Sequence, residues 1–243
     1  MSLNANIGLL SDPDKADRIF GITRGIEKEG LRIDPTGHLS ISEHPKFLGS
    51  ALTHPNITTD FSEALLEFIT EPSSSISDVM AQLSEIHQIA YQHLDQELLW
   101  ASSMPCQLGE EESIPIGQYG SSNIGMMKTI YRRGLGHRYG RHMQTIAGIH
   151  YNFSVPDSLW EDLKKAAKNT QSLKDFKSEG YFGLIRNFRR YSWLLLYLLG
   201  AAPAVCRSFV RNQNHCKHRD KDVLMNPLIT HKDRFKPGMF PLV

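Results

Sequence analysis

Cysteine is scarce in this sequence. Only three cysteines occur in 243 residues, namely Cys106, Cys206 and Cys216. An odd number of widely spaced cysteines argues against a disulfide framework and against a zinc ribbon. A reducing, cytoplasmic location is therefore the one we expect.

An excess of charge of either sign is also lacking. The formal net charge is +1, so the composition favours neither a nucleic acid nor an anionic membrane as a partner. No apolar or arginine-rich export signal opens the chain, and we interpret residues 1–20 as a leader or a short helix. The longest uncharged run, Tyr191–Cys206, contains Gly200 and Pro203 and is too short to span a bilayer comfortably, so we expect a capped, buried helix rather than a membrane anchor.

What is present is typical of a globular domain. Hydrophobic residues make up 40% and charged residues 22%, in a chain long enough for one large domain or two small ones. Helical spacing predicts helices over the segments that follow Ser75, over Gly125–Tyr139, over Pro156–Lys168 and over Phe176–Leu199. We expect the last helix to pack across the back of a sheet.

The chain is organised around an acidic stretch, Gly21–Asp34. It reads as an extended strand, in which Glu27 and Glu29 stand on the same face because residues two apart share a face. The sequence Asp-Pro-Thr-Gly at its end predicts a β-turn and a short return strand over His38–Ser42. Like charges on one face repel each other, so this strand needs a compensating group.

A second acidic run, Thr58–Thr70, repeats the pattern forty residues later, with Asp60 and Glu67 set among apolar residues. Solvated strand faces would explain one such run. Two of them favour a divalent-metal site, because hard oxygen ligands suit such ions and buried carboxylates need a cation. Crowded carboxylates should also raise some of their pKa values when no metal is bound.

Two further stretches add candidate site residues. Met143–Val155 alternates and predicts a third strand, whose polar face would carry Gln144, His150 and Asn152. Gly125–Tyr139 is basic, and it is either a solvated helix or a helix that faces an anion.

Taken together, the motifs GIEKEGLRID, TTDFSEALLEFIT, QYGSSN, KTIYRRGL, RYGRHMQTIAGIHYNFSVP and GYFGLIRNFRRYSWLLLYLL resemble the proteobacterial type of glutamate–cysteine ligase. The resemblance runs from about Gly21 to about Phe209. It implies an α+β fold, akin to glutamine synthetase, in which an antiparallel sheet curves into a funnel with helices outside. It also implies a reaction in which ATP and magnesium join the γ-carboxylate of glutamate to the amine of cysteine through a γ-glutamyl phosphate, the first step of glutathione synthesis.

The resemblance implies roles for individual residues. Metal ligands would be Glu27, Glu29, Asp60, Glu67 and His150. Arg132 would lie beside the phosphate as a catalytic residue. Tyr131 and Leu135 would line a cysteine pocket, and the glutamate would be held by Gln144, Ile146 and Asn152.

The sequence departs from this family in its extent. Family members are about twice as long, and we expect 21–209 to be the N-terminal part of the catalytic domain and 210–243 a divergent, poorly ordered tail such as a frameshift would make. The resemblance therefore leaves three readings open: an active ligase completed by a second chain, a non-catalytic fragment, or another carboxylate–amine ligase of the superfamily.

Overall fold

The computed structural model describes residues 11, 19–105, 107–199 and 208–209. The predicted tail over 210–243, most of the predicted leader over 1–20 and all three cysteines lie outside these residues. The described part of the chain forms an α+β fold around an open antiparallel sheet, as the family resemblance implied.

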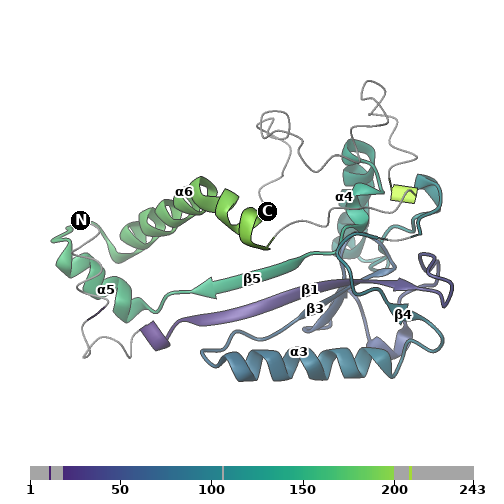
Figure 1. Ribbon diagram of the computed structural model, residues 1–243, viewed down its shortest axis with the longest axis horizontal. Helices are drawn as coiled ribbons and strands as arrows, with labels where there is room; N and C mark the ends of the chain where they lie inside the picture. Colours follow the sequence, from purple (N-terminus) through teal and green to yellow (C-terminus); the bar gives the residue numbers. More distant parts are fainter. Residues whose placement is uncertain (1–10, 12–18, 106, 200–207, 210–243) are drawn as a thin grey trace.

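The sheet is built around its longest strand. The strands are β1 (Thr23–Ile33), β2 (Ile57–Thr59), β3 (Leu65–Ile69), β4 (Leu98–Leu99) and β5 (Ile149–Ser154). Their order is β2-β3-β1-β4, and β5 also pairs with β1, on the side away from β3. Figure 1 shows β1 running the length of the sheet with β5 beside it. Strand β1 therefore pairs with three of the other strands, β3, β4 and β5.

The helices are α3 (Ile76–Tyr91), α4 (Asn123–Tyr139), α5 (Asp157–Ala166) and α6 (Leu173–Leu199), with short 3-10 helices at Lys46–Leu48, Glu111–Ser113 and Met143–Thr145. Helix α3 begins where predicted, because the Ser75 hydroxyl accepts a hydrogen bond from the Asp78 backbone N–H at 3.2 Å and caps its first turn. No helix in the described ranges combines the length and hydropathy that a membrane crossing requires.

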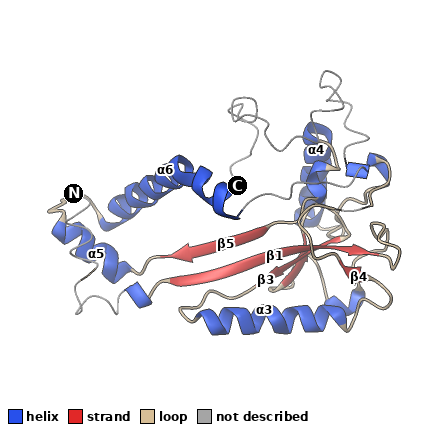
Figure 2. Cartoon of the chain, in the orientation of Figure 1, coloured by secondary structure: helices blue, strands red, loops and turns tan. Residues whose placement is uncertain are grey.

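Helix α3 covers one face of the sheet (Figure 2). Its apolar stripe packs on the β3 side chains that point away from the acidic face, and together they form the main core, which comprises Leu48, Ile57, Leu66, Phe68, Leu83, Ile86, Ala90 and Leu94. Burying such side chains contributes ~1.5–3 kcal/mol each. Among the described helices, α3 is the one that packs on β1 and β3, and the acidic residues lie on the opposite face.

Three predictions about local structure were wrong. Thr58–Thr70 is a hairpin rather than one run, since β2 and β3 pair with each other and residues 60–64 turn between them. Met143–Thr145 is a 3-10 turn, which the Thr145 side chain closes by donating to the His142 carbonyl at 2.7 Å, so the third strand begins only at Ile149. The predicted return strand is reduced to two isolated bridges, one between Leu39 and Ile33 and one between His38 and Gln107.

Helix α6 does not cover the sheet as expected. It packs on α5, where Trp160 meets Tyr181 with ring centroids 5.0 Å apart, and no α6 residue is buried. The reason is geometric: α5 follows the free end of β5 and carries α6 away from the sheet face, as Figure 1 shows. Its apolar side chains remain exposed, from Phe182 to Leu199.

A buried arginine ties the strands to the hairpin turn. The Arg32 side chain is 1% exposed and donates to the Glu97 carboxylate at 2.7 Å, to the Ser42 carbonyl at 2.8 Å and to the Glu63 carbonyl at 2.9 Å. It therefore fixes the turn between β2 and β3. Asp60 begins this turn, and Glu67 lies on the strand that follows it.

We expect Arg32→Met to lower the free energy of unfolding by about 3–5 kcal/mol, because it removes the buried guanidinium that donates to the half-buried Glu97 carboxylate and to two backbone carbonyls. Urea denaturation measures this. Arg186→Met, on the exposed side of α6, is the matched control and should change stability by less than about 0.5 kcal/mol. Equal stability of the two variants would contradict the assigned role of Arg32.

Candidate active site

The acidic side chains meet on the face of the sheet that α3 does not cover. Glu27 and Glu29 lie two residues apart on β1, Glu29 pairs directly with Glu67 of β3, and Glu27 pairs directly with His150 of β5. Side chains of directly paired residues lie on the same face. Three adjacent strands thus place three carboxylates and an imidazole next to one another. The parity of β1 predicted the shared face of Glu27 and Glu29.

Glu27 is held by strand β5. Its carboxylate lies 3.0 Å from His150 Nδ1 and accepts from Asn152 Nδ2 at 2.8 Å. Glu29 is held by the segment before β5, where the Gly148 N–H donates to its Oε2 at 2.7 Å. The two carboxylates are therefore oriented by different anchors, and both anchors depend on β5 pairing with β1.

Three groups of the cluster, Glu29, Glu67 and His150, have raised pKa values. Burial, followed by the charges of Asp60, Glu29 and Glu27, raises the pKa of Glu67 to about 7. Burial also raises the pKa of Glu29, with Asp60 and Glu27 adding to the shift. The hydrogen bond to Glu27 raises the pKa of His150. Sequence reasoning expected crowding alone to do this, whereas burial is the larger cause.

The cluster fits a divalent cation. Ligand atoms of Glu27, Glu67 and His150 lie within 4.8 Å of one another. Carboxylate oxygens are the donors that Mg²⁺ prefers, and a bound cation would offset the repulsion between the carboxylates that contributes to their raised pKa values. Asp60, at the end of β2, acts on Glu29 and Glu67 through its charge. The donor set thus suits a hard metal ion.

A basic group reaches the same hairpin from helix α4. Arg132 donates through Nε to the Asp60 carbonyl, and its guanidinium lies 4.5 Å from the centre of the Tyr119 ring. The Tyr119 hydroxyl donates to the carbonyls of Thr59 and Asp60 at 2.6 and 2.7 Å. Helix α4 therefore brings a cation to the backbone of the hairpin that carries Asp60.

Four predicted substrate residues are not drawn into the cluster. Tyr131 is 61% exposed on α4, and Leu135 lies one turn further along the same helix. Gln144 belongs to the 3-10 turn and Ile146 follows it, so neither shares the face of His150. In the described part of the chain none of these four side chains bonds to the carboxylates; of the predicted substrate residues, Asn152 does.

Sequence reasoning missed two structural members of the site. Tyr119 supports Arg132 and the end of β2, and its only signal was a place in the long irregular segment before α4. Glu63 is buried and accepts from the backbone N–H groups of His44 at 3.0 Å and Gln118 at 2.6 Å, so it anchors loops instead of facing the cluster. Neither role follows from spacing, since both depend on loops that close over the hairpin.

Comparisons with known proteins agree with this geometry. The model of the glutamate-cysteine ligase family matches residues 7–231. Curated glutamate–cysteine ligases include one from Saccharophagus degradans, 58% identical over 85% of this chain and 39% of its own length. Another, from Pseudomonas aeruginosa, is 50% identical over 94% of this chain and 44% of its own length. The chain thus spans about two fifths of the curated relatives that it matches.

Solved structures show the same fold. The glutamate–cysteine ligase of Francisella tularensis in complex with AMP aligns with a TM-score of 0.72 and 39% identity, over 79% of this chain and 37% of that one. A bifunctional glutathione synthetase from Pasteurella multocida aligns with a TM-score of 0.68 and 33% identity, over 76% of this chain and 24% of that one.

The described residues define an α+β fold in which carboxylates line one face of an open antiparallel sheet. The chain belongs to the glutamate–cysteine ligase family. The family model matches residues 7–231, a longer range than the 21–209 over which the motifs resemble the family.

Glu67 makes the stability of the metal-free protein depend on pH. Its carboxyl has a raised pKa of about 7 in the folded chain, so the folded state binds more protons than the unfolded state between about pH 4.5 and 7. The free energy of unfolding should therefore fall as pH rises through this window. We expect Glu67→Gln to flatten the profile and to be more stable than wild type at pH 8 by about 1–2 kcal/mol, after a discount for solvent screening.

Urea denaturation at pH 5 and pH 8 in the presence of a chelator tests this expectation. Glu85→Gln, on the exposed side of α3, is the control and should leave the wild-type profile unchanged. Parallel profiles for wild type and Glu67→Gln would show that Glu67 ionises normally.

Proposed function

We propose that this chain provides the acidic, metal-binding part of an ATP- and Mg²⁺-dependent glutamate–cysteine ligase, which forms γ-glutamylcysteine through a γ-glutamyl phosphate. The observation that carries the proposal is the placement of Glu27, Glu29 and Glu67 side by side on two paired strands. The Francisella tularensis ligase is in complex with AMP, which supports nucleotide use in this family. The chemistry needs such a site, because a carboxylate does not react with an amine until it has been activated.

Glu27, Glu29, Asp60 and Glu67 would hold the magnesium, with His150 beside them. When bound, the ion neutralises the phosphate charges that otherwise repel the glutamate carboxylate. The chain's own residues prepare this site. His150 and Asn152 fix the Glu27 carboxylate, and the Gly148 N–H fixes that of Glu29, so the oxygens need little reorganisation.

Arg132 would contribute positive charge for the transferring phosphoryl group. Its Nε is occupied by the Asp60 carbonyl and one terminal nitrogen, Nη1, donates to the Lys128 carbonyl at 3.2 Å, while the ring of Tyr119 supports the guanidinium plane. We assign Tyr131 and Leu135 to a cysteine pocket, and Gln144, Ile146 and Asn152 to glutamate. This assignment needs additional polypeptide to bring the α4 residues and the residues of the segment 144–152 around one substrate.

The chain's share of its relatives' length bears directly on activity. It spans 39% and 44% of two curated relatives, so we propose that ligase activity requires a complementing polypeptide, covalently joined or separate. The alternative is a non-catalytic role for this chain alone. The other rival, a ligase of the same superfamily that uses a different amine, keeps the acidic site but changes the acceptor pocket.

Magnesium should bind to the chain weakly and through the acidic cluster. We expect the double substitution Glu27→Gln, Glu67→Gln to reduce magnesium affinity at least tenfold, because it removes two of the clustered carboxylates. Isothermal calorimetry with MgCl₂ measures this, and Glu85→Gln is the control for the loss of a carboxylate elsewhere. Unchanged binding by the double variant would refute the assigned ligands.

The purified chain alone should have little ligase activity. Loss of single stabilising groups in concerted sites costs ~10²–10³ in rate, and this chain spans less than one half of the length of its relatives. The measurement is γ-glutamylcysteine formation with ATP and Mg²⁺ at several protein concentrations. Turnover equal to that of a full-length relative would overturn this expectation.

Release of ADP distinguishes the rival ligase in the same assay. With the complementing polypeptide present, we expect ADP release to depend on cysteine. A response to another amine and not to cysteine would favour the other carboxylate–amine ligase.

A further inference from the structure

The back of strand β5 is an apolar surface that no described element covers. Alternation along β5 places Ile149, Tyr151 and Phe153 on the face opposite His150, because Ile149 pairs with Lys28 and Tyr151 with Ile26 of β1. This is the face on which α3 packs, since Phe68 of the α3 core also pairs with Lys28. Yet Ile149 is 64% exposed and Tyr151 is 61% exposed.

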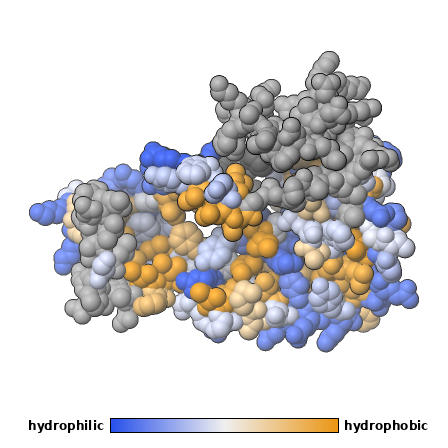
Figure 3. Space-filling view, in the orientation of Figure 1, coloured by the Kyte–Doolittle hydropathy of each residue, from blue (hydrophilic) through white to orange (hydrophobic). Residues whose placement is uncertain are grey.

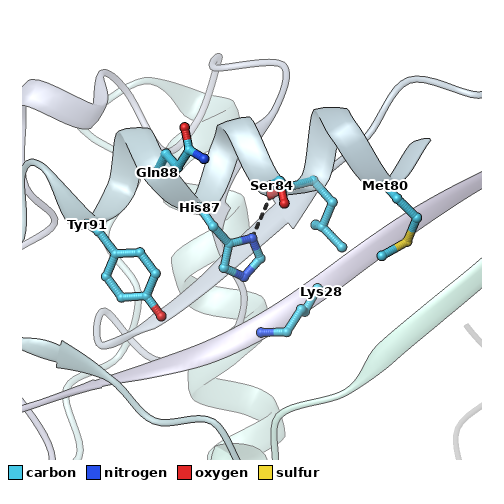
Figure 4. A pocket seen from close by; sticks show the side chains of 7 residues that line it. Lys28, Met80, Ser84, His87, Gln88 and Tyr91 are labelled. Atoms are coloured by element: carbon cyan, nitrogen blue, oxygen red, sulfur yellow. Dashed lines mark hydrogen bonds between the residues drawn. The ribbon is translucent and has the colours of Figure 1, made fainter. Parts of the chain in front are cut away.

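Helix α3 forms one wall beside this surface. A hollow of about 360 Å³ lies between the helix and β1, lined by Lys28, Met80, Leu83, Ser84, His87, Gln88 and Tyr91. Figure 4 shows Lys28 rising from the strand toward His87 and Tyr91, with Met80 at the other end. We call the surface formed by Lys28, Met80, Tyr91 and the back of β5 the α3–β5 trough.

The spacing of the trough matches a helix. Packed helices lie about 8–10 Å apart, which is about two strand spacings of ~4.8 Å. Helix α3 lies over β1 and β3, so a neighbouring helix in the same layer would lie over β5. Its apolar side would bury Ile149 and Tyr151, and Lys28 on the floor of the trough would face it with a positive charge.

We propose that the α3–β5 trough is the docking surface for an amphipathic helix whose carboxylate faces Lys28. This helix belongs to the part of the family polypeptide that lies outside the region matched by this chain. The choice of partner rests on the proposed function. Three observations support it. More than one half of each relative's sequence lies outside the region that matches this chain. The trough is apolar, and in the described part of the chain Lys28 forms no ion pair. Figure 3 shows further apolar surface around α6 and over the strands beneath it, so the uncovered area extends beyond the trough.

Co-expression with a relative's sequence tests the proposal. The tagged chain is expressed together with the part of the Saccharophagus degradans ligase that it does not match, and a photoreactive phenylalanine analogue replaces Tyr151 or, as control, Ile41. Ile41 is 81% exposed in the loop beyond the other end of β1. We expect the partner to co-purify and to be cross-linked from position 151 and not from position 41.

Two matched pairs of variants refine the test. Ile149→Lys should reduce the yield of co-purified partner at least tenfold, whereas Ile41→Lys should leave it unchanged; both sites are exposed, and thermal unfolding confirms that each variant folds. Lys28→Glu should weaken association at least tenfold, whereas Lys28→Met should weaken it less than about threefold.

Several outcomes would overturn the proposal. These are failure to co-purify, cross-linking of position 151 to a second copy of this chain, or equal yields for Ile149→Lys and Ile41→Lys. Equal effects of the two Lys28 variants would contradict the proposal that the partner helix carries a carboxylate toward Lys28. A cross-linked but inactive complex would refute the proposed function and leave the docking intact, while an active complex without the cross-link at 151 would refute the docking alone.

Discussion

The rest of the structure depends on the repulsion between carboxylates that directly oppose one another on β1 and β3. Glu29 and Glu67 form a cross-strand pair of like charges, an arrangement that destabilises a sheet. The fold tolerates it because hydrogen bonds orient Glu27 and Glu29, and because Glu67 takes up a proton at a raised pKa of about 7. A local conflict of this kind is expected at a functional site, where stability is given up for chemistry.

The register of β1 separates the two sides of the molecule. Its odd-numbered residues present Glu27 and Glu29 to the site, and its even-numbered residues present Ile26 and Lys28 to the layer of α3. A slip of one residue would exchange these faces and bury carboxylates against the core. Arg32 opposes such a slip, because its three hydrogen bonds join β1 to the hairpin turn, to the loop at Ser42 and to Glu97.

The features that could be predicted from the sequence were those fixed by local periodicity. The parity of Glu27 and Glu29, the capped helix after Ser75 and the position of α4 follow from spacing and capping, and the structure has them. The site residues far apart in sequence were grouped by resemblance to a family, not by pattern. Strand pairing confirms the proximity of Glu27, Glu29, Glu67 and His150.

The features that could not be predicted are set by tertiary contacts. Thr58–Thr70 alternates poorly because it contains a turn, and the buried Ser62 and Glu63 close that turn through hydrogen bonds to distant loops. Helix α6 has an apolar face that predicts burial, but α5 directs it away from the sheet. Periodicity identifies a face that needs cover without identifying which element covers it.

Strand β5 links the completion of the fold to the completion of the site. One face of β5 supplies His150 and Asn152 to the acidic cluster, and the other supplies Ile149 and Tyr151 to the α3–β5 trough. In the described part of the chain β5 pairs only with β1, so its outer edge retains backbone donors and acceptors that another strand can satisfy. A polypeptide that covers the trough and pairs with this edge would hold β5 more firmly against β1, and the anchors of Glu27 and Glu29 would become more rigid with it. On the proposed docking, the same contacts that bury the exposed apolar surface would preorganise the carboxylates, so folding with the additional polypeptide would also assemble the site.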